Sequence, residues 1–209
     1  MKIFDKNADV GGVWFENVYP GVRCDIPANV YQSGFAPKTQ WTEEYAQGAE
    51  IREYWQDIAK KHNIYQHLHL EHRITYATWD EDKGEWSLTI NNLATGDTYE
   101  ERFDVIITAI GRFNAWRLPD YPGIEDYEGH LRHSSAWDPA FDPTGKAVAV
   151  IGNGASGLQV VPNLQPIVKH MDHYARSKTW IAGSFNGAAK GRTMKPQYYA
   201  KDVLKSFEE

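Results

Sequence analysis

One stretch of the sequence constrains the fold more than any other, a glycine-rich turn between an apolar run and a helix-forming one. Residues 146–151, apolar after Lys146, are typical of a buried strand, and a helix is predicted to begin near Ser156. The turn between them reads Gly152-Asn153-Gly154-Ala155-Ser156-Gly157. Strand, glycine turn and helix in this order predict a dinucleotide-binding α/β unit, with a ligand-free glycine turn as the alternative.

Each glycine of this turn has its own physical task. The first forms the tight turn, the second lets the backbone approach a pyrophosphate, and the third lets the helix pack closely on the strand. Backbone N–H groups and the helix dipole then hold the phosphate charge. The residues predicted to form this phosphate cradle are Gly152, Gly154, Ser156 and Gly157.

The next predicted strand, residues 169–175, indicates which dinucleotide binds. An NAD site has an acidic residue at the tip of this strand, whereas an NADP site has cations for the 2′-phosphate. Here the chain continues as Tyr174-Ala175-Arg176-Ser177-Lys178, with no acid at the tip. We therefore expect Arg176, Ser177 and Lys178 to bind the 2′-phosphate of NADPH, with a solvated basic turn as the alternative.

The first half of the chain predicts a helix and a β-meander. Apolar and aromatic residues recur at helical spacing within residues 49–62, and strand-like runs follow at 67–79, 85–91 and 98–110, separated by glycine-containing turns. The last run ends as a continuous apolar stretch, which predicts a strand buried on both faces. We expect segments at residues 1–111 and 144–209, joined by a connector at 112–143.

Composition excludes several classes of function. The formal net charge is −6, which argues against nucleic-acid binding. No apolar run approaches the roughly 18 residues of a membrane helix, and the N-terminus has no apolar signal core. Cys24 is the only cysteine, which excludes an internal disulfide and a multi-cysteine metal site. We expect a cytoplasmic protein that contacts neither nucleic acid nor membrane.

The connector carries a longer motif. Tyr127, Gly129, His133, Trp137 and Asp138 match the spacing FxGxxxHxxxW[P/D], with tyrosine in place of phenylalanine. This resembles the fingerprint of the Baeyer–Villiger monooxygenases, within the flavin-containing monooxygenase superfamily. The resemblance covers nearly the whole chain, and the run at residues 176–180 is most like fungal members, which implies a role in secondary metabolism. The resemblance implies an α/β protein with an incomplete Rossmann-like fold for two dinucleotides, FAD and NADP, interrupted by a β-meander insertion.

The resemblance also extends to the N-terminal residues. The run from Gly11 to Asp25 looks like the flavin-side loop of that family, and Ala109-Ile110-Gly111 is similar to its Ala-Thr-Gly segment. By this resemblance Asp5 contacts the FAD ribose, the Arg23-Cys24-Asp25 run meets the nicotinamide, and Asp25 and His133 are the candidate catalytic residues. The residues implied to lie against FAD are Val13, Trp14, Asp25 and Tyr31.

The implied activity is an oxygen insertion next to a ketone carbonyl, with FAD, NADPH and molecular oxygen. The sequence begins at what resembles the second strand of the FAD fold, and it carries one dinucleotide fingerprint where the family has two. We therefore expect the isolated chain to be a poor binder of FAD, because the missing turn would supply the donors for its phosphates. We also expect a homo-oligomer, or a partner chain, to complete the sheet.

Other functions stay open at this point. A shortened relative could act as a cofactor-independent isomerase or cyclase, with Asp25, His130 and His133 as acid–base groups. The chain could instead be a non-catalytic subunit that binds NADP or a partner, or a fragment without activity of its own.

Overall fold

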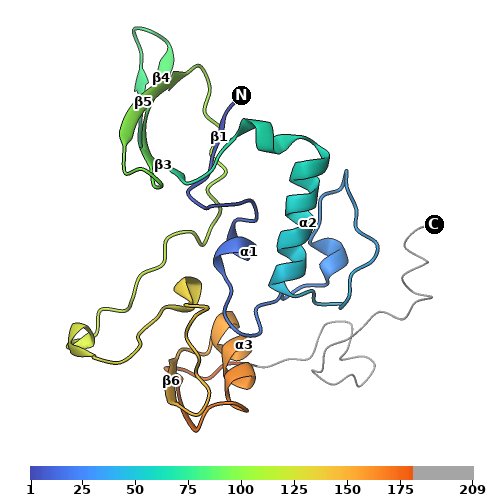
Figure 1. Cartoon of the computed structure of the whole chain (residues 1–209), viewed down its shortest axis with the longest axis vertical. Helices are drawn as coiled ribbons and strands as arrows, with labels where there is room; N and C mark the ends of the chain where they lie inside the picture. The colour runs from blue at the N-terminus through green and yellow to red at the C-terminus, as the bar shows by residue number, and fades with distance from the viewer. Residues whose placement is uncertain (181–209) are drawn as a thin grey trace. The chain divides into compact units, whose positions relative to one another are not determined.

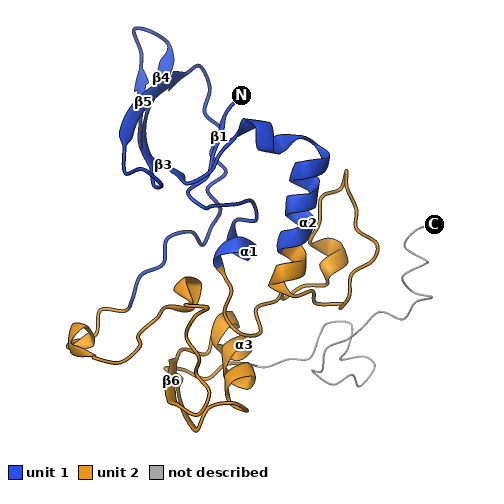
Figure 2. Ribbon diagram, viewed as in Figure 1, with its two compact units in different colours: residues 1–16, 52–118 blue, residues 17–51, 119–209 orange. Residues whose placement is uncertain are grey.

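The computed structural model describes residues 1–180 and divides the chain into two compact units (Figures 1 and 2). Unit 1 comprises Met1–Glu16 and Arg52–Leu118, and unit 2 comprises Asn17–Ile51 together with the chain from Pro119. Each unit therefore combines two stretches of sequence. The domain boundaries drawn at residues 111 and 143 from the sequence stay a prediction.

Unit 1 contains the predicted β-meander (Figure 1). Its three strands pair antiparallel in sequence order, and Leu88 and Ile90 of the middle strand are buried. The strands are β3 (His72–Asp80), β4 (Glu85–Asn92) and β5 (Thr98–Phe103). The strand-like runs and the glycine-containing turns of the sequence thus predicted the meander, but the first expected run is interrupted between His69 and His72 and the third ends at Phe103.

A second, two-stranded sheet in unit 1 carries the N-terminus. Strand β1 (Ile3–Phe4) pairs parallel with β2 (Leu68–His69), and the short helix α1 (Val13–Glu16) follows β1. The predicted helix at 49–62 is α2 (Gly48–Lys61), and the boundary between the units falls inside it. Ile51 and Tyr54 on its apolar face are buried, as the helical spacing predicts.

One expected strand is wrong. The apolar run at residues 104–110 has no regular structure, and Val105, Ile107 and Ile110 are 72%, 87% and 72% exposed. A strand buried on both faces needs neighbouring strands and a covering layer, and no strand within residues 1–180 pairs with this run.

Unit 2 is built on the predicted strand–helix–strand unit. Strand β6 (Ala147–Ile151) leads through the glycine turn into α3 (Ala155–Leu164), and β7 (His170–Tyr174) returns parallel to β6. Val160 and Leu164 of α3 form a core with Tyr19, against which Val148 and Val150 pack. The expectation of a buried strand holds for one face of β6 only within the described residues, because Ile151 on the other face is 60% exposed.

The connector has little regular structure. It contains two short 3-10 helices, η3 (Ile124–Asp126) and η4 (Ser134–Ala136), and another, η1 (Ala28–Val30), lies in the N-terminal part of unit 2. Among the helices of residues 1–180, none has the length and apolar character needed to cross a membrane.

Candidate functional site

The glycine turn of unit 2 has a geometry that side chains would disturb. Gly152 has a φ of +110°, a conformation that residues with a Cβ rarely adopt. A Cβ on Gly157 would lie 2.2 Å from the carbonyl oxygen of Gly152, so the start of α3 packs directly on the turn. The turn is also tied to the sheet, because the Gly152 N–H donates to the Tyr174 carbonyl at 2.9 Å.

The N-terminus of α3 is open to a ligand. Gly154 caps the helix without a side-chain hydrogen bond, and a Cβ built on it would meet no described atom within 4 Å. The first N–H groups of a helix need acceptors, and the helix dipole favours an anion there. Open space beside uncapped N–H groups therefore fits the phosphates of a dinucleotide.

A cavity of about 560 Å³ lies beside this turn in unit 2. It is lined by Asn153, Leu158, Val161, Pro162, His173, Ala175, Ser177, Lys178 and Thr179. Four of these nine side chains are apolar and five are polar, and they come from the glycine turn, from α3, from β7 and from the segment that follows β7. The cavity thus occupies the carboxyl end of the two parallel strands, where ligands bind in open α/β sheets.

Asn153 joins the turn to the segment after β7. Its Nδ2 donates to the Ser177 carbonyl at 2.8 Å and also to Oγ1 of Thr179. His173 donates from Nε2 to the Gly152 carbonyl at 2.9 Å. Sequence reasoning missed Asn153, His173 and Thr179 as site residues. Asn153 lies inside the fingerprint, but no sequence pattern marks the other two.

The three residues predicted to bind the 2′-phosphate follow β7 directly. Ser177 and Lys178 line the cavity, whereas Arg176 is exposed and is not part of its lining. Within residues 1–180 neither Arg176 nor Lys178 forms an ion pair. Both cations are therefore available to an anionic ligand.

The loop that contains Arg23 packs on α3. The Tyr19 hydroxyl donates to Oε1 of Gln159 at 2.9 Å, and Nε2 of Gln159 donates to the Arg23 carbonyl at 3.1 Å. A Cβ on Gly21 would lie 2.9 Å from the Gln159 carbonyl oxygen, which shows how closely the loop approaches the helix. Gln159 is a further residue that the sequence did not indicate.

The residues beside Arg23 differ in exposure. Cys24 is buried, and desolvation raises the pKa of its thiol to about 11, so this group is not a nucleophile near neutral pH. Asp25 is exposed and Tyr31 is half-buried. The exposed carboxylate of Asp25 is thus a group that a ligand could reach.

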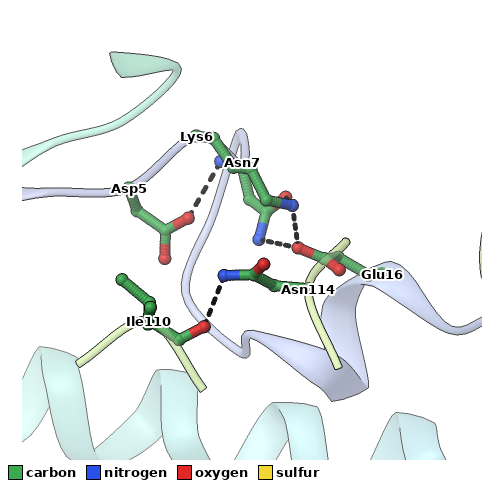
Figure 3. Close-up of polar contacts among 6 residues, drawn as sticks. All are labelled: Asp5, Lys6, Asn7, Glu16, Ile110 and Asn114. Carbon is green, nitrogen blue, oxygen red and sulfur yellow. Dashed lines mark hydrogen bonds and ion pairs between the residues drawn. The ribbon is translucent and has the colours of Figure 1, made fainter. Parts of the chain in front are cut away.

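Among the candidate FAD residues of unit 1, Asp5 follows the end of β1 and lies beside Lys6 and Asn7 (Figure 3). The Asp5 carboxylate accepts from the Asn7 N–H at 2.9 Å, and the side chains of Lys6 and Asn7 both bond to Glu16 of α1. Nearby, Nδ2 of Asn114 donates to the Ile110 carbonyl. Val13 is 38% exposed, and Trp14 lies next to it in α1.

The fingerprint residues of the connector have structural contacts. A Cβ on Gly129 would lie 2.3 Å from the Tyr127 hydroxyl oxygen, so the tyrosine packs over the glycine. Trp137 packs against the Tyr19 core, and Asp138 lies 3.8 Å from the Arg132 guanidinium. His133 caps η4, because its Nδ1 accepts from the Ser135 N–H at 3.1 Å.

His133 predicts a pH dependence of stability. Burial lowers its pKa below the ordinary histidine value, so the folded state favours the neutral ring that accepts from Ser135. The capping contribution is therefore complete above about pH 6.5 and is lost as the pH falls below that value. We expect His133→Ala to cost about 1 kcal/mol at pH 8 and less at pH 5, measured by urea denaturation.

The matched variant His133→Asn keeps a side-chain acceptor that does not titrate. It should retain most of the stability at pH 8 and show a weaker dependence on pH than the wild type. An equal cost of His133→Ala at both pH values would contradict the capping role.

The predicted site residues thus fall in two groups. The phosphate cradle, Arg23, Asp25, Tyr31, His133 and Arg176–Lys178 belong to unit 2, whereas Asp5, Val13 and Trp14 belong to unit 1. Of the predicted site residues, only Ser177 and Lys178 line the cavity, and the glycine turn lies beside it through Asn153. No group of three or more metal-ligating side chains exists in the part of the chain that the structure describes.

Comparisons with known proteins agree on one family. The family model described as flavin-binding monooxygenase-like matches residues 2–194. The FAD-binding monooxygenase tazF of Aspergillus terreus is 39% identical over 185 residues, which cover 88% of this chain and 33% of that protein. A Baeyer–Villiger monooxygenase of Pseudomonas aeruginosa is 37% identical over 86% of this chain and 33% of its own length.

Solved structures give the same result. Cyclohexanone monooxygenase from Rhodococcus sp. Phi1, bound to NADP+, superposes with a TM-score of 0.84 at 26% identity, over 98% of this chain and 36% of that chain. OTEMO in complex with FAD and NADP gives a TM-score of 0.85 at 28% identity, over 98% of this chain and 38% of that one. The chain therefore spans about a third of the length of the proteins that it resembles.

Proposed function

Because the chain belongs to the flavin-binding monooxygenase-like family, we propose that it forms the NADP-binding part, and a portion of the FAD-binding part, of a Baeyer–Villiger-type monooxygenase. The family resemblance and the partial Rossmann-like fold expected from the sequence are confirmed. The relatives are named as monooxygenases, which gives no support to a cofactor-independent isomerase or to a non-catalytic subunit. The substrate that we propose is a small ketone.

The observation that carries this proposal is the open N-terminus of α3 behind the glycine turn. Gly154 leaves space beside the first N–H groups of the helix, and these groups would hold the pyrophosphate of NADPH. Lys178 and Ser177, at the cavity wall, would take the 2′-phosphate together with Arg176. Bound on this surface, NADPH supplies a hydride for the reduction of FAD.

The roles of the remaining residues follow from their surroundings. Arg23 and Asp25 lie on the loop that packs on α3, and we place them beside the nicotinamide. We place Asp5, Val13 and Trp14 at the FAD ribose and ring, with Tyr31 as a further FAD contact. His133 holds η4 in place through its neutral ring, which is the role that its contacts favour over proton transfer. A homo-oligomer or a partner chain, and a cytoplasmic location, stay predictions.

Gly154→Asp tests the phosphate cradle. Aspartate is a favoured N-cap residue and its Cβ would meet no described atom within 4 Å, so α3 should keep its stability or gain about a few tenths of a kcal/mol. Its carboxylate would take the N–H groups and repel the phosphates. We therefore expect NADP+ binding, measured by isothermal titration calorimetry, to fall at least about 100-fold while the unfolding midpoint in urea does not decrease.

The matched control is Gln165→Asp, which places the same charge at the exposed C-terminal end of α3, away from the phosphate cradle. It should weaken NADP+ binding less than Gly154→Asp does. A wild-type chain that binds neither NADP+ nor NADPH would overturn the proposed function, as would a Gly154→Asp variant that binds as tightly as the wild type.

A further inference from the structure

A buried carboxylate in unit 2 has no role in the function proposed so far. Glu43 is 3% exposed and lies in the loop that precedes α2. A carboxylate in such a place is costly unless hydrogen bonds and an opposite charge compensate it. Both of its oxygens are compensated, because Oε2 accepts from Nη1 of Arg23 at 2.8 Å and Oε1 accepts from Nε2 of Gln47 at 2.9 Å.

The backbone around this ion pair is held separately from the side chains. Arg23 and Gln47 form an antiparallel bridge, and the N–H of Cys24 donates to the Ala46 carbonyl at 3.0 Å. On the other side, the Arg23 main chain bonds to Gln159 of α3. Several main-chain hydrogen bonds therefore hold the path of the loop. The position of the Arg23 guanidinium, in contrast, depends on its bond to Glu43.

The guanidinium also keeps donors for a ligand. Only Nη1 of Arg23 bonds to Glu43, and the side chain stays 27% exposed. Within the described residues no other side chain or carbonyl accepts from its Nε or Nη2. Glu43 thus fixes one edge of the planar group and leaves the other N–H donors accessible.

We propose that Glu43 is a positioning residue, which orients the Arg23 guanidinium toward the nicotinamide end of a dinucleotide bound on α3. This inference rests on the proposed function, because it takes Arg23 to contact the bound NADPH. Gln47 is the second member of the arrangement, since it holds the other carboxylate oxygen and prevents the carboxylate from rotating.

Two measurements test the role of Glu43 in the whole chain. The first is the ¹⁵N NMR signal of the Arg23 guanidinium without ligand. In the wild type the Nη groups should give separate signals, because the ion pair slows rotation about the Nε–Cζ bond, and in Glu43→Gln these signals should merge. The control Glu53→Gln removes an exposed charge from α2 and should leave them separate.

The second measurement is a double-mutant cycle on the NADP+ Kd. We expect Glu43→Gln and Arg23→Gln each to raise the Kd about 10-fold, and the double variant to be no weaker than Arg23→Gln alone. Fully additive effects would overturn the proposal, because Glu43 would then act independently of Arg23. Should Glu43→Gln fail to fold, Gln47→Ala loosens the same carboxylate without removing its charge and gives the same NMR test.

The two proposals fail in different ways. A wild-type chain that does not bind NADP+ would overturn the proposed function, and the guanidinium signals would still decide whether Glu43 holds Arg23. A wild-type chain that binds NADP+ but has a freely rotating Arg23 guanidinium would overturn the role of Glu43 alone.

Discussion

Gly157→Ala is expected to destabilise unit 2 by about 3 kcal/mol or more, measured as the free energy of unfolding in urea. The new Cβ would lie 2.2 Å from the Gly152 carbonyl oxygen and 3.0 Å from its carbonyl carbon. Both atoms are backbone, so no side chain can rotate away, and either α3 or the turn must shift. A shift of α3 would also disturb the packing of Val160 and Leu164 on Tyr19.

The control Gly154→Ala separates this clash from the general effect of replacing glycine. Gly154 has a φ of −76°, which any residue adopts, and its Cβ would meet no described atom. We expect its unfolding free energy to stay within about 0.5 kcal/mol of the wild type. Equal effects of the two substitutions would contradict the close contact between α3 and the turn.

The sequence was sufficient to predict the elements that have a local signal. The glycine turn with its flanking apolar runs predicted β6, α3 and β7, and helical spacing predicted α2 within one residue at each end. Residues 104–110 carry an equally strong apolar signal, yet they form no strand. Whether an apolar run becomes a strand depends on neighbours that its own sequence does not specify.

The candidate site was predictable only where a motif carries it. The cradle glycines and the cations after β7 follow a known spacing, whereas Glu43 looks in the sequence like part of a solvated acidic pair before a helix. Its burial and its bond to Arg23 arise from tertiary pairing between two loops. Gln159 contacts residues about 140 positions earlier in the chain, for which no local pattern exists.

The double variant Arg176→Ala/Lys178→Ala is expected to weaken NADP+ binding about 100-fold and to change NAD+ binding less than about threefold. Each charge-assisted hydrogen bond to the 2′-phosphate contributes about 1.5–3 kcal/mol. Because Arg176 and Lys178 are both exposed, we expect each to contribute at the lower end of this range. Calorimetric titration with both coenzymes measures the two affinities. The single variants should show which cation contributes more, and Lys178 lines the cavity whereas Arg176 does not.

The ratio of the two affinities is the informative quantity, because NADP+ and NAD+ differ only in the 2′-phosphate. A defect in folding or in the phosphate cradle would weaken both coenzymes equally, whereas the loss of a 2′-phosphate contact weakens only NADP+. The control Lys61→Ala/Arg73→Ala removes the same positive charge at exposed positions of α2 and β3, and it should leave the ratio unchanged. If the control lowered the ratio of NADP+ to NAD+ affinity as much as Arg176→Ala/Lys178→Ala does, these two side chains would not account for the preference for NADP+. Long-range electrostatic attraction, which salt screens, would then account for it.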